Sequence, residues 1–209
     1  MNKIPKYFIA LVGASLFLAG CSAGTSAVSS QISANDPAAY APPLSGGSST
    51  GADTAFKLTC EEARSVHLIN LYRKANGRGE LSVSKSAVLA SRWHAQDMIS
   101  QNYFSHTEPN GRTFSARASA FGYAALAENI AAGSSSATAL FCQWRNSPGH
   151  NTNMLGNDYS STGIGEASGG GMYGIYWSSN FGGRISDALT QPLTSAQNCA
   201  MPTTVQSCL

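Results

Sequence analysis

Residues 163–181 read GIGEASGGGMYGIYWSSNF, and this stretch decides which kind of fold the sequence predicts. Gly163–Glu166 is typical of a short strand, and Gly169–Gly171 is typical of the turn that would follow it. Tyr173–Phe181 is rich in aromatic and β-branched residues, which favours a returning strand. The stretch therefore predicts an antiparallel hairpin.

The segments between residue 59 and this hairpin predict helices. Thr59-Cys60-Glu61-Glu62 is typical of a capping box, in which the threonine hydroxyl and the Glu62 carboxylate satisfy free N–H groups at a helix start. Apolar residues then recur at helical spacing until Asn76-Gly77. Three further helices are predicted over residues 84–101, 113–121 and 136–146. Helices followed by antiparallel strands indicate an α+β fold in which helices cover a sheet.

The first 21 residues predict an export signal that ends in a lipid attachment site. Two lysines precede an apolar run over residues 7–18, which is too short to span a bilayer. The sequence Leu18-Ala19-Gly20-Cys21 resembles a lipobox, in which the cysteine thiol is acylated before the signal is cut. We expect residues 1–20 to be removed and Cys21 to carry the lipid. A plain signal peptide with an incidental cysteine is the alternative.

The region after Cys21 divides into a tether, a folded domain and a tail. Ser22 resembles the sorting residue of outer-membrane lipoproteins, which applies to a cell with two membranes. Residues 21–56 consist mainly of Ser, Ala, Gly, Thr and Pro with almost no charge, so they cannot bury enough apolar surface to fold alone. We expect them to form a flexible tether, followed by a domain over residues 57–183 and a loop-like tail over residues 184–209.

The charge of the chain limits its partners. The 209 residues include 13 basic and 11 acidic ones, and removal of residues 1–20 takes away two lysines, which leaves a formal net charge of zero. Nucleic-acid binding requires clustered Lys and Arg, so we expect no nucleic-acid partner. An electrostatic membrane anchor is equally unsupported, so the lipid on Cys21 is the expected membrane attachment.

Four cysteines remain beyond Cys21. We expect them to form two disulfides, because an exported protein folds in an oxidising compartment. We therefore describe residues 184–209 as a disulfide-stapled tail. They are Cys60, Cys142, Cys199 and Cys208. Three connectivities are possible. Proximity in the sequence favours Cys199 with Cys208, which leaves Cys60 for Cys142. A metal–thiolate site would need tighter spacing, such as Cys-x-x-Cys.

Three short segments carry the candidate chemistry: NYFSH at residues 102–106, AENIA at 127–131 and WRNSPGH at 144–150. Each places a titratable side chain beside an expected helix end or turn, where binding residues are frequent. Neutral His106 and His150 are good ligands for Zn²⁺, and Glu128 could ligate, orient a histidine or hold a metal-bound water. Local roles are the alternative, with each histidine bonded at a helix end and Glu128 acting as a cap acceptor.

These motifs, in this order and together with Gly163-Ile-Gly165 and Tyr176-Trp177, resemble the bacterial branch of the CAP superfamily. That group includes the cysteine-rich secretory proteins, antigen 5 and the plant pathogenesis-related 1 proteins. The resemblance covers roughly residues 60–183. It implies a three-layer α-β-α sandwich with a central antiparallel sheet, and a surface cleft lined by a His, Glu, Glu, His tetrad.

The resemblance assigns three of the four tetrad positions to His106, Glu128 and His150. The second glutamate falls at Ser147, which is a weaker ligand and cannot act as a carboxylate base. In some members the two histidines bind Zn²⁺ or another divalent ion. With two protein donors, His106 and His150, we expect weak metal binding completed by water. His67 and His94 match no role and are expected to be packing or surface residues.

The incomplete tetrad favours a non-enzymatic binding module for a lipid, a glycan or an envelope protein, with no catalytic residue assigned. A metal-dependent hydrolase is the second hypothesis, in which Glu128 activates a water on a metal held by His106 and His150. Catalytic zinc sites commonly have three protein ligands, which disfavours it. A structural role at the cell envelope, with a vestigial cleft, is the third.

Overall fold

The computed structural model describes residues 56–183, 199–205 and 207–208. The predicted signal over residues 1–20, the lipidation site Cys21, nearly all of the predicted tether and residues 184–198 lie outside this part of the chain. Within the described residues the elements are α1 (Cys60–Ala75), β1 (Ser82–Val83), α2 (Lys85–Ser100), α3 (Phe114–Ala120), β2 (Ala125–Ala132), α4 (Ala137–Arg145), α5 (Pro148–Leu155), β3 (Ser161–Gly170) and β4 (Gly174–Gly182).

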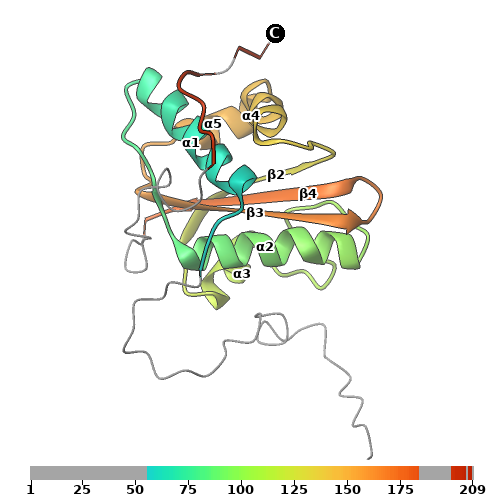
Figure 1. The fold of residues 1–209 in the computed structure, drawn as a ribbon. Helices are drawn as coiled ribbons and strands as arrows, with labels where there is room; N and C mark the ends of the chain where they lie inside the picture. Colours follow the sequence, from blue (N-terminus) through green and yellow to red (C-terminus); the bar gives the residue numbers. More distant parts are fainter. Residues whose placement is uncertain (1–55, 184–198, 206, 209) are drawn as a thin grey trace, which may run out of the picture. The chain divides into compact units, whose positions relative to one another are not determined.

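The four strands form one open sheet in the order β1-β3-β4-β2. β4 is antiparallel to both β3 and β2, and only the two-residue β1 runs parallel to its neighbour β3. Helices α2 and α3 cover one face of the sheet, and α1, α4 and α5 cover the other (Figure 1). The prediction of an α+β fold with three layers is therefore confirmed, with β1 as a short parallel addition to the antiparallel sheet.

The four predicted helices are confirmed, and side-chain caps fix where they begin. The Thr59 hydroxyl accepts the N–H of Glu62 at 3.1 Å, while the Thr59 N–H donates to the Glu62 carboxylate at 2.8 Å, which completes the predicted capping box. Ser84, Thr113 and Ser136 each accept the amide N–H three residues further on. Each cap satisfies a donor that the first helical turn leaves unpaired.

The predicted hairpin is confirmed, but its turn lies further along the chain. β3 continues through Gly169 and pairs as far as Gly170, which lies opposite Gly174. The turn is formed by Gly171–Tyr173 instead of Gly169–Gly171. Gly171 and Gly174 take φ values of +65° and +75°, which glycine adopts without the steric cost that a side chain imposes.

The sequence did not predict strands β1 and β2 or helix α5, and β2 is the one of these that carries Glu128. Its residues ALAENIAA show five consecutive buried positions in place of alternation, and alanine favours strands poorly. The strand forms because it pairs with β4 along its length, from Ala125 opposite Gly182 to Ala132 opposite Tyr176. The expectation that Glu128 lies beside a helix end or turn is therefore wrong, since it lies inside a strand.

Two glycines of β3 allow α2 to approach the sheet closely. A Cβ atom on Gly163 would lie 2.2 Å from the backbone nitrogen of Val88, and one on Gly165 would lie 2.2 Å from that of Arg92. No side chain fits at either distance. Close packing of α2 on β3 therefore explains why both positions of the Gly-Ile-Gly motif are glycine. On the other face, Trp144 of α4 and Trp177 of β4 are fully buried in the main hydrophobic core.

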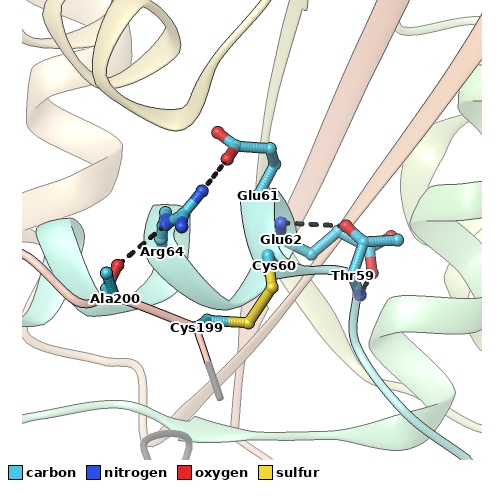
Figure 2. The surroundings of a disulfide bond; sticks show 7 residues. All are labelled: Thr59, Cys60, Glu61, Glu62, Arg64, Cys199 and Ala200. Atoms are coloured by element: carbon cyan, nitrogen blue, oxygen red, sulfur yellow. Dashed lines mark hydrogen bonds and ion pairs between the residues drawn. A yellow bond between two sulfur atoms is a disulfide. The ribbon is translucent and has the colours of Figure 1, made fainter. Parts of the chain in front are cut away.

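The disulfides correct the favoured pairing. Cys60 is bonded to Cys199, and Cys142 is bonded to Cys208, so both tail cysteines pair with the helical layer instead of with each other. Figure 2 shows Cys199 reaching the start of α1, where the Nε of Arg64 also donates to the Ala200 carbonyl at 2.9 Å. Proximity in the sequence misled the prediction because the two partners lie on neighbouring helices, α1 and α4, which only the packed domain brings together. The expectation of two disulfides among these four cysteines is confirmed.

Candidate functional site

Glu128 lies at the centre of the candidate site, buried on strand β2. Its Oε1 lies 2.9 Å from the Nδ1 of His106, and its Oε2 accepts hydrogen bonds from the Arg117 guanidinium and from the Ser178 hydroxyl, the latter at 3.2 Å. Both carboxylate oxygens therefore have partners. His106 and Glu128, predicted to converge, do converge.

These partners determine the ionisation of Glu128. Burial by itself raises the pKa of a carboxyl group, because it removes water from the charged form. The hydrogen bond with His106 and the positive charge of Arg117 act in the opposite direction and hold the pKa of Glu128 below its ordinary value. Glu128 is consequently ionised at neutral pH. It accepts hydrogen bonds from its partners, and the protons stay on those partners.

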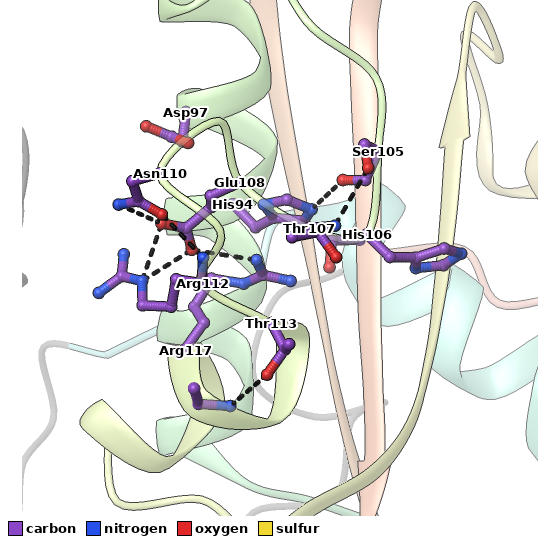
Figure 3. A network of polar contacts seen from close by, with 12 residues as sticks. His94, Asp97, Ser105, His106, Thr107, Glu108, Asn110, Arg112, Thr113 and Arg117 are labelled. Atoms are coloured by element: carbon purple, nitrogen blue, oxygen red, sulfur yellow. Dashed lines mark hydrogen bonds and ion pairs between the residues drawn. The ribbon is translucent and has the colours of Figure 1, made fainter.

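Arg117 joins Glu128 to a second buried carboxylate. Its guanidinium lies on α3, fully buried, and its Nη1 donates to the Oε1 of Glu108 at 3.2 Å. Arg112 also donates from Nε to Glu108, at 2.8 and 2.9 Å, and stacks over the Trp93 ring at 4.5 Å from the ring centroid. Figure 3 shows Glu108 held between Arg112 and Arg117. Two buried acids are thus balanced by two guanidinium groups, which limits the cost of burying the charges.

A buried histidine of α2 supports the segment that carries His106. His94 is fully buried, and its Nε2 donates to the carbonyl of Ser105 at 3.1 Å and lies 4.0 Å from the Oε1 of Glu128 (Figure 3). Burial lowers the pKa of His94 to about 3, so the ring is neutral. His94 is therefore a packing residue, as expected, but one that touches the candidate site.

Tyr103 and Asp97 complete this support. The Tyr103 hydroxyl donates to the Asp97 carboxylate at 2.6 Å and lies 3.4 Å from the Nδ1 of His94. Burial, reinforced by the hydrogen bond with Asp97, raises the pKa of Tyr103, so the hydroxyl keeps its proton. The segment that ends at His106 is thus attached to α2 through two side chains.

His106 presents one ring nitrogen outward. Its side chain is 48% exposed, although its Nδ1 meets a buried carboxylate. An ionised carboxylate only accepts hydrogen bonds, so Nδ1 carries the proton and donates to Glu128. In the neutral ring the lone pair then resides on Nε2, which is the nitrogen available to a ligand.

His150 is brought to the same region by contacts between α5 and β2. Asn129 donates to the His150 carbonyl at 3.1 Å, and Asn153 donates to the Glu128 carbonyl at 3.2 Å. The half-buried His150 ring lies 6.4 Å from the Trp144 ring, between centroids. Burial lowers the pKa of His150, and the charge of nearby His106 lowers it further.

The described residues do not bring together three or more His, Cys, Asp or Glu side chains that could hold a metal ion. Ser147 is the N-cap residue of α5 and its hydroxyl makes no capping hydrogen bond, but a serine hydroxyl is a poor ligand for Zn²⁺. The imidazoles of His106 and His150 are the remaining candidate donors, and Glu128 is hydrogen-bonded to His106.

Sequence reasoning missed most of the support beneath the site. Arg117, Glu108, His94 and Ser178 were not among the predicted site residues. Apart from Arg112, which lies four residues after Glu108, their partners described above are 9 to 50 residues away in the sequence, so local spacing does not identify them. The low charge content, 11% of the chain, is the one hint, since each buried ion pair then uses a substantial share of the charged residues.

Known proteins resemble this chain in sequence. The model of the cysteine-rich secretory protein (CAP) family matches residues 66–181. Uncharacterized protein YkwD of Bacillus subtilis (strain 168) is 29% identical over 150 residues, which are 70% of this chain and 56% of the relative. Uncharacterized membrane protein YlbC of the same organism is 28% identical over 109 residues, 51% of this chain and 32% of that protein. The chain thus spans about half of the length of YkwD and about a third of the length of YlbC.

Solved structures share the fold. An extracellular protein containing a SCP domain from Bacillus anthracis str. Ames superposes with a TM-score of 0.53 at 27% identity, covering 59% of this chain and 40% of that one. An outer surface protein from Borrelia burgdorferi gives a TM-score of 0.52 at 19% identity, covering 62% and 98%, and shows the fold alone. The matched motifs, the three-layer fold and the family model lead to one conclusion: this chain belongs to the cysteine-rich secretory protein (CAP) family.

Proposed function

We propose that this chain is an envelope-anchored CAP lipoprotein whose domain binds a ligand and does not turn it over. The observation that carries this proposal is the state of Glu128. Both of its oxygens are engaged, by His106 on one side and by Arg117 and Ser178 on the other. A general base must reach a water or substrate proton, and Glu128 is only 4% exposed, with protein partners at both oxygens. Glu128 instead orients His106, which is a role in binding.

Turnover assays test this directly. We expect no hydrolysis of peptide or lipid ester substrates above the background of a heat-denatured sample, with or without added Zn²⁺. Hydrolysis that Glu128→Gln abolishes, while the exposed control Glu80→Gln leaves it intact, would favour the metal-dependent hydrolase instead.

We further propose that His106 and His150 hold a divalent ion such as Zn²⁺ weakly, together with water. The hydrogen bond from Nδ1 of His106 to Glu128 supports this, because a carboxylate behind a histidine fixes the tautomer that a metal requires. Calorimetric titration with Zn²⁺ should show one weak site that His106→Ala and His150→Ala each remove. His67→Ala is the control, since His67 contacts the tail carbonyl of Pro202 at 2.8 Å.

The pH dependence of that titration gives an independent check. Protonated imidazole cannot ligate, so the affinity for Zn²⁺ should fall as the pH drops through the ordinary pKa range of imidazole, about 6.5. Equal affinity at pH 8 and pH 5 would contradict ligation by histidine.

The envelope location rests on the N-terminal segment. Its lipobox-like sequence supports a lipid on Cys21, and Ser22 supports the outer membrane in a cell with two membranes. The B. anthracis relative is described as extracellular, which agrees with export. Within the described residues no helix is both long and apolar enough to cross a membrane.

Processing of the precursor tests the lipid anchor. Globomycin, or Cys21→Ala, should leave the precursor unprocessed and without incorporated palmitate on a labelled gel. Normal maturation of the Cys21→Ala variant would show that Cys21 is incidental to an ordinary signal peptide.

A further inference from the structure

The tip of the β3–β4 hairpin exposes apolar side chains at one end of the sheet. Met172 is 73% exposed and Tyr173 is 49% exposed, and Phe104, from the segment after α2, is 43% exposed beside them. We call these three residues the apolar tip. The other large exposed hydrophobic residue of the described chain, Leu126, pairs near Gly182 at the opposite end of the sheet.

The apolar tip is a continuous surface. The Phe104 and Tyr173 rings meet edge to face, with centroids 5.9 Å apart. Both also contact Tyr176, which is buried beneath them, at 6.3 and 5.8 Å. The Tyr176 hydroxyl accepts the N–H of Tyr173 at 3.4 Å, which holds the turn against the sheet. The exposed rings are therefore supported from below.

Three segments that meet at the apolar tip contain no charged residue. The 13 basic and 11 acidic residues of the chain all lie outside residues 98–105, 129–144 and 167–183. These three segments meet at the hairpin: Gly133 donates to the Ile175 carbonyl at 2.9 Å, and Ile99 packs over Gly170. Transfer of these three segments out of water thus requires none of their own side chains to lose the hydration of a charge.

We propose that the apolar tip inserts into the interface of the membrane to which the chain is attached, an inference that rests on the lipid anchor proposed above. Aromatic side chains without nearby charges favour the headgroup region of a bilayer. A stable protein–protein interface takes about 20–30 residues a side, whereas a few apolar side chains suffice for interfacial insertion. The size of the apolar tip therefore matches a membrane contact better than a protein contact.

The tether is long enough for this contact. The described chain begins at Phe56, whose ring lies 5.4 Å from Lys85 and 5.3 Å from Arg92, in the first half of α2. The apolar tip lies beside the other end of α2, a helix of about 24 Å. If the 35 residues from Cys21 to residue 55 form the tether that their composition predicts, their root-mean-square span is about 33 Å. Anchoring also raises the local concentration of bilayer, so a weak contact suffices.

Fluorescence of the full-length chain bound to phospholipid vesicles tests the proposal. Met172→Cys is labelled with an environment-sensitive dye, and Leu126→Cys, labelled in the same way, is the matched control at the other end of the sheet. Spin-labelled lipids should quench the dye at position 172 at least twofold more than the dye at position 126. Adding Phe104→Ser and Tyr173→Ser to the Met172→Cys chain should remove most of that difference.

The outcomes separate the proposal from the lipid anchor on which it rests. A chain that floats with the vesicles but shows equal quenching at positions 172 and 126 overturns the membrane contact and leaves the anchor intact. A chain that does not float overturns both. A blue shift at position 172 that grows with protein concentration in the absence of vesicles shows that a second copy covers the apolar tip. The wild-type chain, treated with the same dye, reports any reaction at Cys21.

Discussion

Glu128 shows how a single residue links stability to binding. Its burial is tolerated because Arg117 and Ser178 occupy one oxygen and His106 the other. The same contacts fix the proton of His106 on Nδ1. A change that removes the charge of Glu128 therefore acts on the core and on the exposed histidine at once.

Replacement of Glu128 by glutamine should destabilise the domain and weaken Zn²⁺ binding together. Loss of one partner of a buried ion pair costs about 3 kcal/mol, because Arg117 keeps its charge in the core. Loss of the carboxylate behind a ligating histidine weakens metal affinity by about 10- to 100-fold. Chemical denaturation and calorimetry measure the two effects. The exposed control Glu80→Gln should change the free energy of unfolding by less than about 0.5 kcal/mol.

His94 should make the domain sensitive to acid. Its folded-state pKa of about 3 lies below the unfolded value of about 6.5, so the unfolded chain binds the proton first as the pH falls. The stability associated with neutral His94 is complete above pH 6.5 and is lost progressively toward pH 3.

His94→Gln removes this titration while keeping a donor for the Ser105 carbonyl. Between pH 7 and pH 5 the wild-type domain should lose about 2 kcal/mol more than the variant, as measured by urea unfolding at each pH. Identical pH profiles for the two proteins would show that His94 titrates normally. His67→Gln, on the surface of α1 against the tail, provides the comparison.

At the scale of elements, the contact between β3 and α2 determines how the helix carrying His94 lies over the sheet. Gly163 and Gly165 place the backbone of β3 directly against the backbone of α2. The other end of the site depends on β2, whose pairing with β4 places Glu128 opposite Asn180. The site is therefore built between a helix on one face of the sheet and an edge strand of that sheet.

Gly163→Ala should strongly destabilise the domain. The added methyl would lie 2.2 Å from the Val88 nitrogen, so α2 must move away from the sheet. Overpacking of this kind costs about 1–3 kcal/mol or more, which lowers the midpoint of thermal unfolding. Gly79→Ala is the control because open space surrounds that position. Equal melting temperatures for the two variants would contradict the close packing.

At the scale of the whole molecule, the two disulfides attach the last residues of the chain to the helical layer formed by α1, α4 and α5. Cys199 reaches α1 and Cys208 reaches α4, with Met201 and Val205 packed against the main core between them. The tail thus adds to the hydrophobic layer that covers the face of the sheet opposite α2.

Peptide mapping of the non-reduced protein should recover Cys60 linked to Cys199 and Cys142 linked to Cys208. The two bonds close segments with sequence separations of 139 and 66 residues, so each restricts the unfolded chain substantially. Cys142→Ser combined with Cys208→Ser should lower the free energy of unfolding by about 2–5 kcal/mol. A map in which Cys199 is linked to Cys208 would contradict the structure.

The amino-acid sequence was sufficient to predict four helices, the hairpin and the family. Local interactions carry that information: the Thr59 capping box, the cap residues Ser84 and Ser136, and the aromatic returning strand all act over a few residues. The order of the histidine and glutamate motifs was sufficient to match His106, Glu128 and His150.

Strand β2, the disulfide pairing and the support beneath the site depend on tertiary contacts that the sequence alone does not reveal. The alanine-rich segment forms a strand because its backbone pairs with β4. Each tail cysteine bonds to the thiol that the packed helices place beside it. Glu128 is ionised because folding places it beside Arg117 and His106. His94 is neutral because folding buries its ring. These features depend on residues far apart in the sequence, and their energies arise when water is excluded from between them.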